Sequence, residues 1–168
     1  PILFIVILSA EGENGASWTA FIFGFILGIS DAFDGVLARA TNSETKLGAF
    51  LDPLADKVVV LGCMFSLLAI GRFHYLPVLI IAVREIGIST FRFLKARRKI
   101  IIPASKLAKW KTFAQGSALL LAVLPPLKDN DWLVTTILWF AVLMTLVTGW
   151  QYVRNSSLMT AASKEGQI

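Results

Sequence analysis

The feature that most limits the fold of this chain is a series of long apolar segments separated by short polar stretches. A membrane-spanning helix needs about 20 predominantly apolar residues. Segments of about that length are expected at residues 18–39, 46–70, 75–95, 105–124 and 132–152. Only 16% of the residues are charged, whereas soluble domains contain about a quarter. The sequence therefore predicts an all-α, polytopic membrane protein.

A shorter apolar segment precedes these five. It reads PILFIVILSA, ten uncharged residues that are too few to cross a bilayer. We expect it to be the outer part of a first transmembrane helix whose beginning is truncated here; a cleaved signal peptide is the alternative. The expected architecture is thus a single domain, residues 1–168, forming a six-transmembrane-helix bundle.

Basic residues predict how this bundle is oriented. Between the expected spans, one side collects Arg39, Lys46, the run from Lys95 to Lys111, and Arg154, whereas the other side has Arg72 and Lys128. Positive loops face the cytoplasm, so the net charge of +5 needs no nucleic-acid partner to explain it. Interfacial aromatic residues are expected near the segment ends, at Trp18, Tyr75, Trp132, Trp150 and Tyr152.

Four aspartates interrupt the apolar pattern in the second and third segments. Residues 31–56 read DAFDGVLARATNSETKLGAFLDPLAD, a pattern of D-x2-D-G-x2-A-R-x8-G-x3-D-x3-D. Successive helical residues turn by about 100°, so Asp31 and Asp34 share one side of a helix. Asp52 and Asp56 share a side of the next helix. Two helices joined by a short loop are antiparallel neighbours, so the four carboxylates are expected to converge, and cations must then neutralise them.

The surrounding residues suit a metal and a phosphate. Oxygen ligands without a nearby His or Cys favour a hard ion such as Mg²⁺ or Mn²⁺. The single cysteine, Cys63, lies in an apolar run and is expected to be buried, and the single histidine, His74, lies in a loop on the other side. Chemistry alone leaves three readings open, namely a metal–phosphate site, an ion or proton path, and structural pairing of the aspartates with Arg39, Lys57, Arg84 or Arg92.

The pattern resembles that of the CDP-alcohol phosphatidyltransferases, which transfer a phosphatidyl or related group from a CDP-linked donor to an alcohol. The resemblance implies a six-helix membrane bundle, often a homodimer. It also implies a dinuclear Mg²⁺ or Mn²⁺ centre held by Asp31, Asp34, Asp52 and Asp56, with Asp56 as the general base. Gly35, Arg39 and Thr45 match positions that contact the donor. The N-terminal amphipathic segment of the family is not in this sequence, so donor contacts from that region are not assigned.

Within the family, TKLGAFLDPLADK, REIGISTFR and SKLAKWKT resemble members that form phosphatidylglycerophosphate. This implies CDP-diacylglycerol and glycerol 3-phosphate as substrates, CMP as a product, and an active site on the cytoplasmic face of the cell membrane. Inositol phosphate or phosphatidylglycerol as acceptor, and a cation transporter as a different class, are the alternatives. An acceptor phosphate needs a cationic pocket, for which the candidates are Arg84, Arg92, Lys109 and Lys111. A structural pair of Arg84 with Glu85 or with an aspartate is the alternative for that arginine.

Overall fold

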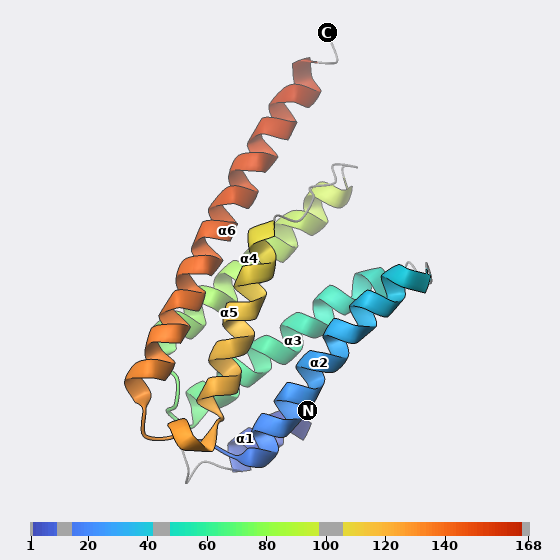
Figure 1. Ribbon diagram of the computed structural model, residues 1–168. Helices are drawn as coiled ribbons and strands as arrows, with labels where there is room; N and C mark the ends of the chain where they lie inside the picture. Colours follow the sequence, from blue (N-terminus) through green and yellow to red (C-terminus); the bar gives the residue numbers. More distant parts are fainter. Residues whose placement is uncertain (1, 10–14, 42–47, 98–105, 166–168) are drawn as a thin grey trace.

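The computed structural model of the protein describes residues 2–9, 15–41, 48–97 and 106–165 (Figure 1). Within the helices, side chains are described except at residues 2, 31–41, 48–54, 56, 92, 95–97, 106, 108 and 155–165. The described residues form helices and no strand. The helices are α1 (Ile2–Ser9), α2 (Trp18–Thr41), α3 (Gly48–Ala69), α4 (Tyr75–Arg97), α5 (Lys106–Ala122) and α6 (Asp131–Glu165), with a 3₁₀ turn, η2 (Pro125–Leu127), between the last two.

Five of these helices, α2 to α6, correspond closely to the expected segments, which confirms the all-α prediction. The last expected span, 132–152, agrees with the apolar part of α6, Asp131–Arg154, and the helix itself continues to Glu165. The hydropathy of the chain falls after residue 152, but the next residues, VRNSSLMTAASKE, contain neither proline nor glycine. Since proline and glycine are the residues that most strongly disfavour a helix interior, nothing in this stretch ends the helix where its apolar part ends.

The chain direction alternates along the bundle. α2, α4 and α6 begin at the lower end of Figure 1, where α3 and α5 finish, and they run towards the opposite end. A buried arginine joins two turns at the lower end. Arg72, in the turn between α3 and α4, donates to the carbonyl of Ala122 at 3.3 Å and to that of Leu127 at 2.5 Å, and it pairs with Asp131. Arg72 and Lys128, which were expected on the same side of the membrane, therefore lie together at this end of the bundle.

Small residues allow the helices to approach closely in the core. Ala114, Ala118 and Ala122 are buried at intervals of four along α5, which packs most extensively against α6. Such spacing places them on one face of the helix, and the missing bulk lets two helix backbones lie near one another. At the other side of the bundle, the ring of Phe4 on α1 lies over Gly62 of α3, where a Cβ atom would come within 2.4 Å of it.

Large apolar side chains cover the outside of the bundle on every long helix. Exposed examples are Phe25 and Ile26 on α2, Val58 on α3, Val83 and Ile86 on α4, Phe113 on α5, and Phe140 and Leu143 on α6. Soluble monomers rarely expose contiguous apolar surface on this scale. Of the helices as described, the part of α6 from Asp131 to Arg154 is long and apolar enough to cross a membrane, and Trp18–Ser30 and Lys57–Ala69 are shorter apolar stretches. These features suit contact with lipid.

The aromatic residues expected at the membrane interfaces are exposed, with one exception. Trp18, Tyr75 and Trp132 are exposed and begin α2, α4 and α6, all at the lower end of Figure 1, and Trp150 is exposed in the second half of α6. Tyr152 is buried, so its assignment to an interface is wrong. Two residues that are two positions apart on a helix differ in direction by about 200°. Trp150 therefore points outwards and Tyr152 points into the bundle.

Candidate active site

The motif aspartates lie on two consecutive helices, as expected. Asp31 and Asp34 are in the second half of α2, and Asp52 and Asp56 are in the first half of α3. Only residues 42–47 separate Thr41 from Gly48, so the chain limits the distance between these two helix ends to roughly 25 Å. The helical placement is confirmed. The convergence of the four carboxylates stays a prediction, because their side chains are outside the described set.

The residues expected to contact the CDP-linked donor are likewise placed only by their position in the chain. Gly35 and Arg39 lie on α2. Gly35 directly follows Asp34, and Arg39 is about one helix turn later. Thr45 lies outside the described residues. Among the side chains that are described, no three of His, Cys, Asp or Glu gather into a group that suits a metal ion. The motif aspartates are not in that set, and four carboxylates at i, i+3 and i, i+4 spacing remain a suitable oxygen donor set for Mg²⁺ or Mn²⁺.

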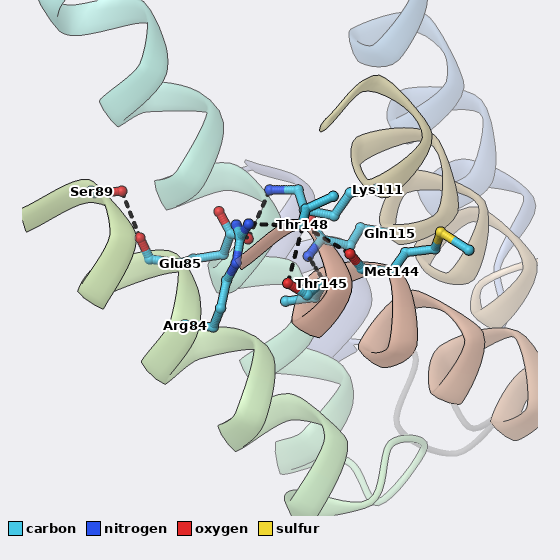
Figure 2. A network of polar contacts seen from close by, with 8 residues as sticks. All are labelled: Arg84, Glu85, Ser89, Lys111, Gln115, Met144, Thr145 and Thr148. Atoms are coloured by element: carbon cyan, nitrogen blue, oxygen red, sulfur yellow. Dashed lines mark hydrogen bonds and ion pairs between the residues drawn. The ribbon is translucent and has the colours of Figure 1, made fainter. Parts of the chain in front are cut away.

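A second group of charged residues is described in full, between α4, α5 and α6 (Figure 2). Arg84 and Glu85 are on α4, and Lys111 is on α5. Glu85 Oε1 accepts a hydrogen bond from Arg84 Nη1 at 2.7 Å and another from Lys111 Nζ at 2.7 Å. The Glu85 residue is only 5% exposed. The structure thus brings two of the expected acceptor-phosphate residues together around one carboxylate, and the cluster carries a net positive charge.

Hydroxyl and amide groups from α5 and α6 continue this cluster. Thr148 Oγ1 accepts a hydrogen bond from Arg84 Nη2 at 2.8 Å and itself lies 2.8 Å from the carbonyl of Met144. One turn earlier, Thr145 accepts a hydrogen bond from Gln115 Nε2 at 3.0 Å, and both residues are buried (Figure 2). Sequence reasoning missed these three residues. Their signal was present, since polar side chains inside apolar spans usually face the bundle interior.

Arg84 also borders a groove on the outside of this cluster. The open groove, of about 500 Å³, runs between α4 and α6, and Arg84, Gly87 and Gly149 contribute to its lining. A Cβ atom on Gly149 would lie 3.2 Å from Arg84 Nε, so the glycine makes room for the guanidinium group. Among the residues that the structure describes, none accepts a hydrogen bond from Arg84 Nε. That N–H group is buried, so it is a donor without a partner inside the packed helices.

The other expected acceptor residues are not part of the cluster as described. Arg92 is on α4, seven residues after Glu85, and its side chain is outside the described set. Lys109 is exposed near the beginning of α5. Lys57 of α3 lies close enough to Lys111 for the two ammonium charges to interact. Since Lys57 directly follows Asp56, the cationic cluster lies near the α3 segment that carries the motif.

The single cysteine and the single histidine lie where the sequence predicted. Cys63 is buried in α3 and is not in a disulfide. His74 is exposed in the turn between α3 and α4, at the end of the bundle opposite the motif. The charged cluster as described is built from the carboxylate of Glu85 and the cations of Arg84 and Lys111.

Comparison with known proteins identifies the family of this chain. A probable phosphatidylglycerophosphate synthase of Mycobacterium tuberculosis is 33% identical over 160 residues, covering 93% of this chain and 75% of the relative. A CDP-diacylglycerol–glycerol-3-phosphate 3-phosphatidyltransferase of Rickettsia bellii is 41% identical over 129 residues, covering 74% and 71%, and that of Rickettsia felis is 34% identical over 157 residues, covering 90% and 86%. The family model for CDP-alcohol phosphatidyltransferase matches residues 1–147, so the chain belongs to this family of membrane-bound lipid-biosynthesis enzymes.

Proposed function

We propose that this protein transfers the phosphatidyl group of CDP-diacylglycerol to sn-glycerol 3-phosphate, giving phosphatidylglycerophosphate and CMP. The observation that carries the proposal is the complete aspartate motif on α2 and α3 in a chain of this family. The names of relatives at 33–41% identity, from Mycobacterium and Rickettsia, support glycerol 3-phosphate as the acceptor. A cation transporter would give no reason for Gly35 and Arg39 at their places in the motif.

The donor would bind at the cytoplasmic ends of α2 and α3. Asp31, Asp34, Asp52 and Asp56 are the proposed ligands of two Mg²⁺ or Mn²⁺ ions, which when bound neutralise negative charge on a pyrophosphate and on departing CMP. Arg39, with its planar guanidinium, suits a phosphate oxygen pair. Gly35 leaves space for close approach of the donor, and Thr45 offers it a hydroxyl group.

The acceptor would bind beside the cationic cluster. Glycerol 3-phosphate carries a phosphate near a charge of −2, which needs cations once it leaves water. Arg84 and Lys111 supply them from within the bundle, at 12% side-chain exposure each. Arg92 and Lys109 are the further candidates. Asp56 then accepts the proton of the attacking hydroxyl group, whose oxygen displaces CMP from the lipid-linked phosphorus in line.

The proposed setting is a bundle of six membrane spans with this site open to the cytoplasm. The apolar exteriors of α2 to α6 support contact with lipid on all sides, and the distribution of Lys and Arg supports the orientation. A homodimer is the expected assembly, as implied by the family resemblance alone.

The test is release of CMP from CDP-diacylglycerol by purified protein in mixed micelles, with added Mg²⁺ or Mn²⁺. Glycerol 3-phosphate, inositol 1-phosphate and phosphatidylglycerol are compared as acceptors, and glycerol 3-phosphate is expected to give the highest kcat/KM. Asp56→Asn should abolish release, whereas Asp129→Asn, a matched change at an exposed position on the opposite side, should not. A higher kcat/KM with another acceptor would refute the proposed specificity, and no release with any acceptor would refute the enzyme.

A further inference from the structure

Glu85 is a buried acidic residue with no role in the proposed reaction. A carboxylate in a membrane protein interior is costly unless cations surround it, and here two cations from different helices reach the same oxygen atom. Arg84 Nη1 and Lys111 Nζ are each 2.7 Å from Glu85 Oε1. Their two nitrogen atoms are therefore at most twice that distance apart, a separation that a single phosphate group can bridge with two of its oxygens.

Without a carboxylate between them, two cations would not stay at this separation. Like charges in a low-dielectric interior repel strongly, and a lysine stem with four rotatable carbons would turn away from the arginine. The arginine is held on a second side by Thr148, at 2.8 Å from Nη2. Arg84 is thus fixed by two partners from different helices, and Lys111 is held by Glu85.

Both cations have N–H groups to spare. An arginine has five donors and a lysine ammonium has three. Among the described contacts, Arg84 Nη1 and Nη2 use one donor each, on Glu85 and Thr148, and Lys111 Nζ uses one on Glu85. The cluster can thus hold an incoming anion without releasing Glu85, so the carboxylate can keep its contacts while the substrate binds.

We propose that Glu85 is a positioning residue for the acceptor's phosphate group: it holds Arg84 and Lys111 at a fixed separation so that their remaining donors bind the phosphate together. This inference rests on the proposed function, because it assigns a role within the same acceptor site. A purely structural ion pair would make the bundle more stable but would affect both substrates alike. A positioning residue affects the acceptor alone.

The experiment measures KM for both substrates in Glu85→Gln, which keeps the size of the side chain and removes its charge. We expect the KM for glycerol 3-phosphate to rise roughly tenfold or more, as for the loss of one charge-assisted hydrogen bond. The KM for CDP-diacylglycerol should stay within about twofold. Ser89→Ala is the matched control, since Ser89 Oγ, one turn further along α4, donates to the backbone carbonyl of Glu85 at 2.5 Å and not to its carboxylate.

A double-mutant cycle with Lys111→Met tests whether Glu85 acts through the lysine. If it does, the double variant should have about the same acceptor KM as Lys111→Met alone. Thr148→Val, a nearly isosteric change at the other partner of Arg84, is the variant to measure if Glu85→Gln does not fold. It should also raise the KM for glycerol 3-phosphate and leave the KM for CDP-diacylglycerol unchanged.

The outcomes separate this inference from the function on which it rests. No turnover of glycerol 3-phosphate by the unsubstituted protein would refute the proposed function. Normal turnover together with an unchanged acceptor KM in Glu85→Gln, equal changes in both KM values, or additive effects in the cycle would refute the role of Glu85 alone.

Discussion

Replacing Arg72 by alanine should destabilise the bundle strongly, although the residue is far from the aspartate motif. Its side chain is 1% exposed. It donates to the carbonyls of Ala122, Leu127 and Lys128, at 3.3, 2.5 and 2.8 Å, and pairs with Asp131. Without the guanidinium, the carbonyl groups that close α5 and η2 would lose their donor, and the turns that it joins would lose their link.

The magnitude follows from these contacts. A hydrogen bond from a charged group contributes about 1.5–3 kcal/mol where it is buried, and the bonds to Ala122 and Leu127 are partly buried. The bond to Lys128 and the pair with Asp131 are exposed and contribute less, about 0–1 kcal/mol each. We expect a loss of about 4 kcal/mol in the free energy of unfolding, or a fall in Tm on the order of 10 °C for a chain of this size.

The assay is thermal unfolding in detergent micelles, followed by circular dichroism. Lys128→Ala is the control, because it removes a basic side chain from the same turn region and keeps the backbone carbonyl that accepts from Arg72. If Arg72→Ala unfolds within about 2 °C of Lys128→Ala, the network contributes little to stability, and the reasoning that the arginine joins the two turns is refuted.

Three further predictions concern the packing and the site. Gly62→Ala should lower the Tm by several degrees, because its Cβ would come within 2.4 Å of the Phe4 ring and α1 would have to move; circular dichroism checks this. Gly149→Ala should raise the KM for glycerol 3-phosphate several-fold with little change in stability, because its Cβ would press on Arg84 Nε at 3.2 Å; steady-state kinetics with both substrates check this. Removal of divalent cations with a chelator should abolish CMP release, and Mg²⁺ or Mn²⁺ should restore it, whereas activity that persists in chelator would contradict a metal centre.

The helices were predictable from the sequence because hydropathy and length determine them. The second segment was expected at residues 18–39, and the helix runs from Trp18 to Thr41. The fourth was expected at 75–95, and the helix runs from Tyr75 to Arg97. The continuation of α6 to Glu165 was not predictable in this way, because the residues after the apolar span carry no membrane signal and contain neither proline nor glycine to end the helix.

The cationic cluster was predictable only in part. Arg84 and Lys111 were expected to act together because both were candidates for the cationic pocket that an acceptor phosphate needs. Their shared contact with Glu85 required the register between α4 and α5, which no single helix pattern contains. Thr148 is 64 residues from Arg84 along the chain, so its hydrogen bond to the guanidinium depends on how α4 and α6 pack and could not be derived from local spacing.

The position of Lys57 supports a connection between the two halves of the site. Lys57 follows Asp56 on α3, and its charge interacts with that of Lys111 on α5. Lys57 is thus part of the charged surroundings of Lys111. Consecutive residues on a helix have Cα atoms about 3.8 Å apart, so the backbone that carries the proposed base lies next to Lys57. The proposed acceptor cluster and the α3 segment that carries the proposed base are thus connected through Lys57, which is the neighbourhood that the proposed transfer requires.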